Sequence, residues 1–269
     1  MLRSILFWIL AFVITAGSAV FQRKTGPTWP VDGEVSFANS IIKYEFERAH
    51  EGKTDHKVEI EVLDKNIGGI LYYKRFKTAD DWTSVTMTRK ENNLTGFLPH
   101  QPPAGKLLYY VELNSNSSKL SIPEKGPIQI RYKDEVPLSI ILIHVFFMFA
   151  AMLVSTKAGI QVLIKGENIR KYAIWTAALM FIGGFILGPI MQKFAFGDYW
   201  TGFPFGFDLT DNKTLIAMIA WVIALIKGRN DQKADGWVLA ASIITFVIFM
   251  IPHSMLGSEF DYSQLPNGQ

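Results

Sequence analysis

The chain has 269 residues, of which 49% are hydrophobic, with a mean hydropathy of +0.18 and a formal net charge of +3. The small net charge, without a run of like charge, argues against a nucleic-acid-binding protein, and the absence of cysteine excludes disulfides, thiolate metal sites and thiol redox chemistry. Because the apolar residues are concentrated in blocks, the composition predicts membrane spans combined with a water-soluble part.

The first apolar block, residues 4–21 (SILFWILAFVITAGSAVF), is long enough to span or nearly span a bilayer. Its short basic start and the small residues of AGSA are also typical of a cleavable signal peptide. We favour an uncleaved signal anchor over residues 1–22, because the apolar run is longer than a usual signal-peptide core.

Residues 28–136 have the pattern of a β-domain. Short segments with strand-like alternation are separated by Gly, Pro, Asn and Asp at turn-like spacing, which is typical of an antiparallel sandwich. These segments begin at Ile41, His56, Gly69, Thr83, Leu94, Leu107 and Ile128. The stretch from Trp82 to Leu113 resembles the middle of a fibronectin type III or immunoglobulin-like domain. That resemblance implies a sandwich architecture and says little about function.

Four further apolar segments follow Pro137. They lie near residues 138–156, 172–191, 213–227 and 236–252. Each has about 15 to 20 residues, which suffices for a span once polar ends and tilt are allowed for. The expected fold class is therefore a membrane α-helical bundle plus an all-β domain: an N-terminal anchor helix, an extracytoplasmic sandwich and a four-helix transmembrane domain over residues 137–256.

Basic residues in the short loops predict the orientation of the helices. The loops 157–171 and 227–235 are basic, whereas the loop 192–212 carries only Lys193. The basic residues of the first two loops are Lys157, Lys165, Arg170, Lys171, Lys227, Arg229 and Lys233. Arg23 and Lys24 disagree, but they are outnumbered. We therefore expect a multi-pass protein of the cytoplasmic (inner) membrane. Its β-domain, outer loop 194–212 and tail 257–269 would lie on the periplasmic side.

Two of the five histidines are candidate ligands. His144 is expected about two turns inside the outer end of its helix, and His253 at the outer end of the last helix. Ionisable side chains in membrane segments are costly and therefore count as candidate functional sites, although either imidazole could instead bond a neighbouring helix or lie in the interface. The spacing of His50, His56 and His100 is not that of metal ligands, and we expect them at the surface of the β-domain.

The outer loop 194–212 concentrates aromatic residues. Tyr199 and Trp200 could form a simple interfacial belt. Asp208 or Thr210 could cap the next helix, with Asp211 in its first turn. Neither explanation covers the phenylalanines at positions 203, 205 and 207, which alternate with Gly and Pro in a backbone that cannot easily be helical. The loop therefore predicts an extended aromatic platform for a large, flat, apolar ligand at the membrane surface.

Residues 196–225 resemble the tryptophan-rich WWD segment of the cytochrome c assembly, or haem-handling, membrane proteins. The matching residues are Phe196, Gly197, Tyr199, Trp200, Phe207 and Asp208, followed by Leu215, Ile216 and Trp221. In that family one external histidine precedes the segment and another follows it, and together they hold haem; His144 and His253 are the counterparts. The resemblance covers about residues 138–260, and two of the family's three tryptophans are phenylalanine in this chain.

The resemblance implies a non-covalent, b-type haem at the outer membrane face, for haem delivery or electron transfer. His144 and His253 would ligate the iron from opposite sides. Loop aromatics would cover the macrocycle, two aspartates would orient an imidazole, and a lysine would pair with a propionate. These residues are Tyr199, Trp200, Phe203, Phe207, Asp208, Asp211 and Lys213. The tail GSEFDY would close over the site, and the implied partners are apocytochrome c or a redox protein.

Two alternatives remain open. The chain could be a membrane-anchored adaptor without a cofactor, whose sandwich binds another membrane or periplasmic protein. A non-haem metal could also bind to His144, His253 and Asp208. The sequence contains no nucleophile–base pair, phosphate loop or zinc motif, so it gives no indication of hydrolysis or group transfer.

Overall fold

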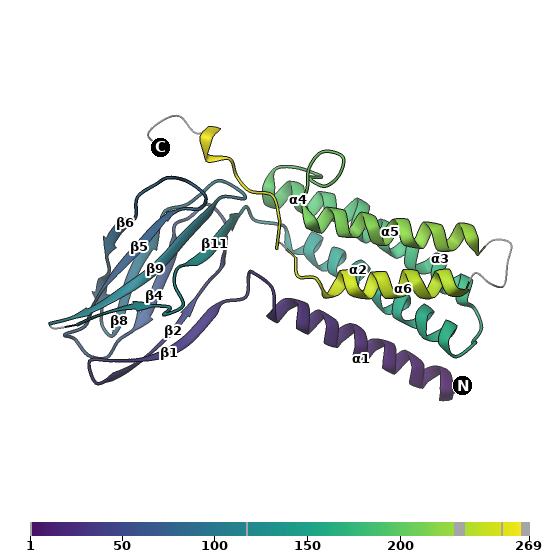
Figure 1. Ribbon diagram of the computed structural model, residues 1–269, viewed down its shortest axis with the longest axis horizontal. Coiled ribbons are helices and arrows are strands. Elements are labelled where there is room, and N and C mark those ends of the chain that lie inside the picture. The colour runs from purple at the N-terminus through teal and green to yellow at the C-terminus, as the bar shows by residue number, and fades with distance from the viewer. Residues whose placement is uncertain (1, 117, 229–234, 254, 265–269) are drawn as a thin grey trace. The chain divides into compact units, whose positions relative to one another are not determined.

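The computed structural model describes residues 2–116, 118–228, 235–253 and 255–264 (Figure 1). The chain divides into two compact units. The helical unit contains Met1–Pro27 and Val136–Ser258, and the β unit contains Thr28–Glu135 together with the tail from Glu259 onward. In this division the tail from Glu259 onward groups with the β unit.

The helical unit consists of helices that run side by side, as Figure 1 shows. They are α1 (Leu2–Lys24), α2 (Leu138–Leu163), α3 (Ile169–Met180), a π-helix (Phe181–Leu187), α4 (Gly188–Phe196), α5 (Leu209–Lys227) and α6 (Asp235–Met250). Among the described residues, α1, α2, the continuous helix Ile169–Phe196 and α5 are long and apolar enough to cross a membrane. The 16 residues of α6 are also apolar but fewer. Four such helices indicate a membrane protein.

Small and hydroxyl-bearing residues lie where the helices meet, as is common in membrane bundles. Gly159 of α2 faces α6, since a Cβ at this position would lie 2.5 Å from the Ser242 hydroxyl. Ser242 donates to the carbonyl of Ser155 at 2.8 Å, and the Trp221 indole donates to Thr245 at 2.7 Å. These polar contacts join α2, α5 and α6.

The loops collect at two ends of the helical unit, as the alternation of spans requires. At one end, the Arg170 guanidinium donates to the carbonyl of Gly228. At the other end, the Gln22 amide donates to the carbonyl of Phe249 at 2.6 Å. Of the expected loop cations, Lys157 lies inside α2 and is buried, so its placement in a loop was wrong. Arg229 and Lys233 lie outside the described residues.

The described residues of the β unit form eleven strands in three sheets. They are β1 (Val31–Phe37), β2 (Ser40–Phe46), β3 (Ala49–Glu51), β4 (His56–Glu61), β5 (Gly68–Arg75), β6 (Thr83–Thr86), β7 (Thr88–Lys90), β8 (Asn93–Leu98), β9 (Lys106–Ser115), β10 (Ser118–Ile122) and β11 (Ile128–Lys133). The six-stranded sheet has the order β3-β11-β9-β5-β6 with β10 beside β9, the three-stranded sheet has the order β4-β8-β7, and β1 pairs with β2. Six of the seven predicted segments each contain one strand of the structure, whereas the segment that begins at Thr83 is divided into β6 and β7, which belong to different sheets. The strands β1, β3 and β10 were not predicted.

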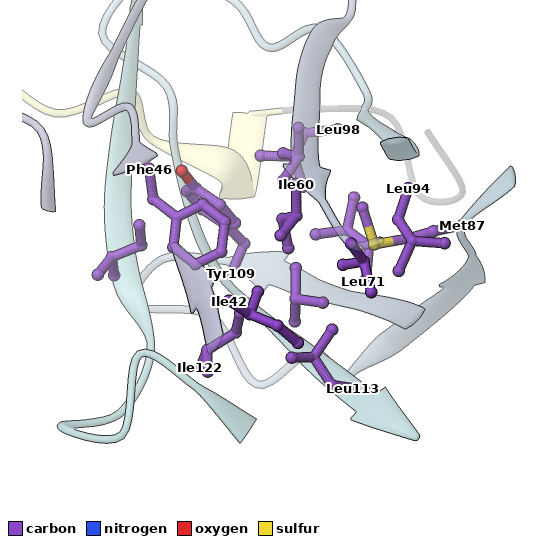
Figure 2. Packing of buried hydrophobic residues seen from close by; sticks show 14 of the residues in the cluster. Ile42, Phe46, Ile60, Leu71, Met87, Leu94, Leu98, Tyr109, Leu113 and Ile122 are labelled. Atoms are coloured by element: carbon purple, nitrogen blue, oxygen red, sulfur yellow. The ribbon is translucent and has the colours of Figure 1, made fainter. Parts of the chain in front are cut away.

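Alternating side chains of all three sheets form one apolar core (Figure 2). In β4, for example, every second residue is buried, as the period of a strand facing a core requires. Two expectations need correction. The sheets are not wholly antiparallel, because β3 pairs with β11 in parallel. His56, which was expected at the surface, is buried with 8% of its area exposed, because it opens β4 on the core-facing register.

Candidate cofactor site

A cavity of about 330 Å³ lies inside the helical unit, and both candidate histidines line it. The remaining lining is mostly apolar and comes from α1, α2, α3, α4, α5 and α6. It consists of Thr15, Ser18, Ala19, Gln22, Arg23, Val145, Met148, Phe149, Met152, Met180, Met191, Lys213, Thr214, Ala217, Ile248 and Phe249. The structure thus brings together two imidazoles that are 109 positions apart in the sequence.

His144 has the hydrogen bonding of a ligand histidine. Its Nδ1 lies 3.0 Å from the carbonyl oxygen of Gly183. A carbonyl only accepts, so Nδ1 carries the proton and, in the neutral ring, Nε2 keeps its lone pair. Metal-binding histidines are commonly oriented by such a bond from the other ring nitrogen.

The acceptor of this bond belongs to the π-helix. The Gly183 carbonyl also accepts from the backbone amide of Gly188, five residues on, and π-turns of this kind are frequent at functional sites. The segment needs its glycines. A Cβ at Gly183 would lie 2.7 Å from the sulfur of Met148, and one at Gly184 would lie 2.6 Å from Thr214 Cγ2. The missing side chains let the π-helix approach α2 and α5.

His253 is tied to Lys213. The Lys213 side chain is buried near the start of α5, and its Nζ donates to the carbonyl of Ile251 at 2.7 Å. The same Nζ lies 3.0 Å from Nδ1 of His253. Lys213 therefore contacts the chain just beyond α6 and one nitrogen of the candidate ligand.

Four methionines line the cavity, and sequence reasoning missed them. Met148 and Met152 follow His144 at intervals of four residues, so the three side chains share one face of α2. Met180 and Met191 come from α3 and α4. The four-residue spacing of His144, Met148 and Met152 could have indicated a shared helix face from the sequence alone. Thioethers are polarisable, and methionine can serve as an axial ligand of haem iron.

The two aspartates of the predicted site hold the outer loop. Asp211 accepts the backbone amides of Thr201 at 2.7 Å and Gly202 at 2.9 Å. Asp208 caps α5 by accepting from Thr210 at 2.8 Å, and its second oxygen accepts from the amide of Ser258. The capping prediction is therefore confirmed. Their partners are loop, helix-cap and tail groups, and neither aspartate has a hydrogen bond to an imidazole in the described structure.

The loop aromatics do not line the cavity. Tyr199, Phe203 and Phe207 are 59%, 67% and 93% exposed. The Trp200 ring stacks on Phe185 with 5.6 Å between centroids, and its indole donates to the carbonyl of Phe203. Large exposed aromatics beside apolar helices suit the interface of a membrane.

No family model and no curated protein matches this chain. The resemblance to cytochrome c assembly proteins therefore stays a prediction from the residues. Within the described part of the chain, no group of three or more His, Cys, Asp or Glu residues is arranged to hold a metal ion. Asp208 is likewise absent from the cavity lining. The functional groups that line the cavity are two imidazoles, four thioethers, the side chains of Lys213, Arg23 and Gln22, and three hydroxyls.

Proposed function

We propose that the helical unit binds haem in the cavity lined by His144 and His253. The observation that carries this proposal is that both imidazoles line one largely apolar cavity, while the Nδ1 proton of His144 is committed to the Gly183 carbonyl. A neutral imidazole with a free Nε2 is a common axial ligand of haem iron.

At His144 the commitment of Nδ1 to the Gly183 carbonyl supports the proposal, because it leaves Nε2 as the nitrogen that would bind iron. At His253 the fit depends on the proton in the contact with Lys213. If the lysine donates, the ring proton stays on Nε2 and blocks that nitrogen; if Nδ1–H donates to a neutral amine, Nε2 is free to bind iron. The cavity volume lies at the lower end of the range of about 300–1,000 Å³ that is usual for small-molecule and cofactor sites.

Bound haem would supply one-electron redox chemistry or be the cargo itself. This chain would contribute the rest. His144 would bind and orient through α2 and the π-helix, and the apolar lining would exclude water. Lys213 would hold the proton that decides whether His253 binds. A dry, apolar environment and the identity of the axial ligands are the protein's main means of setting a haem potential.

An absorption spectrum tests the proposal. Protein purified from cells supplied with haem should show a Soret band with low-spin α and β bands. His144→Ala and His253→Ala should each lose the low-spin bands, because each removes one of the two imidazoles that would bind the iron. His100→Ala is the matched control, since that histidine belongs to the β unit. A colourless wild-type protein, under conditions that load other haem proteins, would refute haem binding.

A second candidate function is a membrane-anchored adaptor, and an aromatic surface of the β unit favours it. Tyr72 of β5 and Tyr110 of β9 are cross-strand partners whose rings stack at 4.9 Å. Trp82 packs edge-on against Tyr110 at 5.0 Å, and Lys74 lies 5.2 Å from the Trp82 ring. Tyr and Trp are the residues most enriched at the energetic centre of protein interfaces.

Photo-crosslinking separates the adaptor from the haem protein. A photoreactive amino acid at position 82 should capture one defined protein in native membranes. The same group at position 97, which is exposed on β8, is the control. Equal capture from both positions, or none from position 82, would contradict an interface at the aromatic surface.

A further inference from the structure

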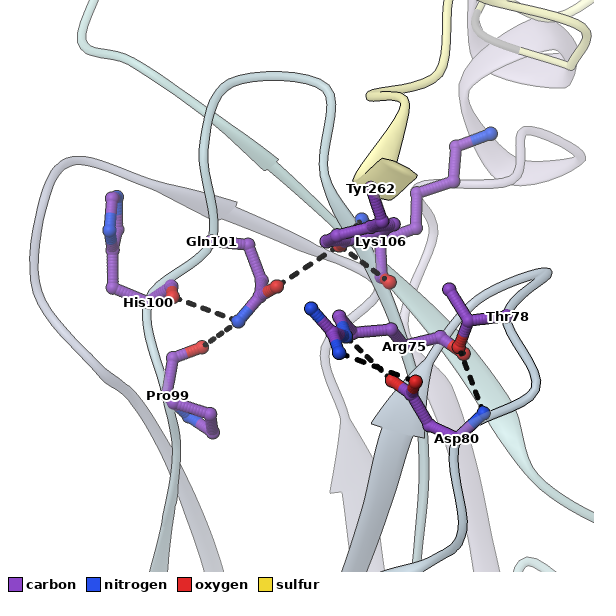
Figure 3. Close-up of polar contacts among 8 residues, drawn as sticks. All are labelled: Arg75, Thr78, Asp80, Pro99, His100, Gln101, Lys106 and Tyr262. Carbon is purple, nitrogen blue, oxygen red and sulfur yellow. Dashed lines mark hydrogen bonds and ion pairs between the residues drawn. The ribbon is translucent and has the colours of Figure 1, made fainter. Parts of the chain in front are cut away.

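The tail segment Glu259–Tyr262 packs into a groove of the β unit, where Glu259 pairs with Lys106. Figure 3 shows Tyr262 beside Gln101 and Lys106. The groove runs between the end of β5 and the start of β9, and an open space of about 560 Å³ remains in it beside the tail. Its framework side is lined by Arg75, Lys77 and Lys106 among others, and the tail forms its remaining wall. All of these residues belong to the β unit, so the site is complete without the helical unit.

Lys106 supplies the electrostatic recognition in this groove. Its side chain is only 6% exposed, yet its Nζ is paired with Glu259 Oε1 at 2.7 Å. Lys77 Nζ binds the second oxygen, Oε2, at 2.8 Å. Burial lowers the pKa of Lys106, and the hydrogen bond with Glu259 partly restores it. A buried ammonium group is costly without a counter-ion, and the counter-ion of Lys106 in the described structure is the tail.

Tyr262 supplies the second recognition element. Its hydroxyl accepts from the backbone amide of Lys106 at 2.9 Å and lies 3.0 Å from Oε1 of Gln101 as a donor. Figure 3 shows Gln101 held in turn by backbone carbonyls, so that it presents this acceptor. The Arg75 guanidinium lies 5.4 Å from the Tyr262 ring. A Cβ at Gly105 would lie 3.1 Å from the same hydroxyl.

Most of the contacts that hold the tail come from its side chains. One backbone bond, from the Phe260 amide to the carbonyl of Ala104 at 3.2 Å, accompanies them. The groove therefore binds three groups of the tail: a carboxylate, one backbone amide and a tyrosine hydroxyl. The tyrosine lies three residues after the glutamate. The receptor groups of Lys106 and Gln101 are set by strand and turn backbone, which prepares them before any segment binds.

We infer that this groove is a recognition site for an acidic–aromatic peptide segment of a partner protein, of the form Glu-x-x-Tyr, and that the tail of the chain is its resident occupant. Charge complementarity identifies the partner segment: two lysines, one of them buried, require a carboxylate, and charge-assisted bonds to it are the strong ones. This site is independent of haem binding. A partner segment must displace the chain's own tail. Because the tail is tethered beside the groove, its effective concentration is on the order of millimolar.

A labelled peptide tests the inference. The probe is fluorescein-GSEFDYSQ, which copies residues 257–264, and the protein is the full chain in nanodiscs. The tail is disabled by Glu259→Ala with Tyr262→Ala. This variant should bind the peptide at least about tenfold more tightly than the wild type, because the tethered competitor is gone. A peptide with glutamine in place of its glutamate should lose most of that affinity.

Two controls keep the inference falsifiable. Adding Lys77→Met to the tail-disabled variant should weaken peptide binding, because one of the two ammonium groups that bind the glutamate is removed. Lys77 is exposed, so this substitution should not affect folding. The β-sheet circular dichroism of each variant verifies folding. The inference is overturned if the folded, tail-disabled protein does not bind the peptide, or binds the glutamine peptide equally well. If the groove instead binds the tail of a second copy of this chain at the concentrations where the peptide binds, the inferred partner protein would be wrong and the groove would serve self-association.

Discussion

Nδ1 of His144 donates a hydrogen bond to the carbonyl oxygen of Gly183 across a distance of 3.0 Å. This bond joins the candidate ligand on α2 to a π-helix 39 residues further along the chain. It sets the tautomer of the imidazole and the direction of its second nitrogen. The position of Gly183 therefore controls the geometry of the proposed site.

Gly183→Ala should change the geometry of the proposed site, although Gly183 does not itself line the cavity. The new Cβ would lie 3.1 Å from Met148 Cγ and 3.2 Å from its backbone nitrogen, in addition to the closer sulfur contact. Because the backbone of α2 cannot give way cheaply, we expect a loss of about 1–3 kcal/mol in the stability of the helical unit and weaker low-spin haem bands. Thermal unfolding in detergent and the absorption spectrum measure the two effects.

Gly188→Ala is the matched control for that substitution. Its Cβ would lie 3.5 Å from the Gly183 oxygen and 3.8 Å from the His144 ring, which are ordinary contacts. Similar losses in both variants would contradict the role of close packing at Gly183.

Trp8→Leu should destabilise the helical unit through Lys157. The lysine is fully buried in α2, and its Nζ has no hydrogen-bond partner among the described residues but lies 5.3 Å from the Phe7 ring and 5.4 Å from the Trp8 ring. Removing one ring should cost about 1–2 kcal/mol, the value of a desolvated cation–π contact. The midpoint of thermal unfolding measures it.

Lys157→Met should leave stability unchanged or raise it, since a buried charge is replaced by an apolar chain of similar length. Combined with Lys157→Met, the Trp8→Leu substitution should lose most of its effect. Additive effects in this double-mutant cycle would show that the ring and the ammonium do not interact.

Asp211→Ala should loosen the outer loop. The carboxylate accepts the amides of Thr201 and Gly202, and both donors would lose their partner. Each unsatisfied donor that stays buried costs about 1–3 kcal/mol, so hydrogen exchange of residues 197–208 should accelerate strongly. Asp211→Asn keeps one acceptor oxygen and should have a smaller effect. Asp198→Ala, on an exposed side chain of the same loop, should change little; equal acceleration there would refute the assignment.

The β unit should lose stability in mild acid because of His56. Burial, and then the neighbouring His50, lowers the pKa of His56 from 6.5 to about 4. Its Nδ1 lies 3.3 Å from that of His50. Between pH 6.5 and about 4, His56 is protonated in the unfolded chain but stays neutral in the folded chain. Stability is therefore complete above pH 6.5 and falls by roughly 2–3 kcal/mol as the pH drops through this window.

Denaturant unfolding of the β-sheet signal at several pH values measures this slope. His56→Gln should flatten it, because the titrating group is gone. His100→Gln serves as the reference variant and should keep the wild-type slope. An unchanged slope in His56→Gln would assign the acid sensitivity to other groups.

Much of the fold could be predicted from local patterns. Apolar blocks predicted the helices, since a bilayer span needs a long apolar run regardless of its neighbours. Alternation predicted strands such as β4 and β9, because successive side chains of a strand point to opposite faces. The capping role of Asp208 was also readable, because a cap involves residues within one turn.

Errors and omissions arose where contacts are distant in sequence. Lys157 was read as a loop cation because only the packing of α1 supplies its aromatic partners. Burial of His56 depends on the sheet against which β4 packs. The methionines beside His144 share a visible spacing, but that spacing alone does not distinguish a lipid-facing stripe from a cavity wall.

The amino-acid sequence by itself therefore determined the membrane character, the division into a helical and a β unit, and the two histidines that deserve a test. Only the tertiary structure decided that His144 and His253 line one cavity, that the loop aromatics do not, and that Tyr262 binds beside Lys106. The reason is physical: side-chain periodicity is a property of a single segment, whereas a cavity or a groove exists only where segments far apart in the chain pack together.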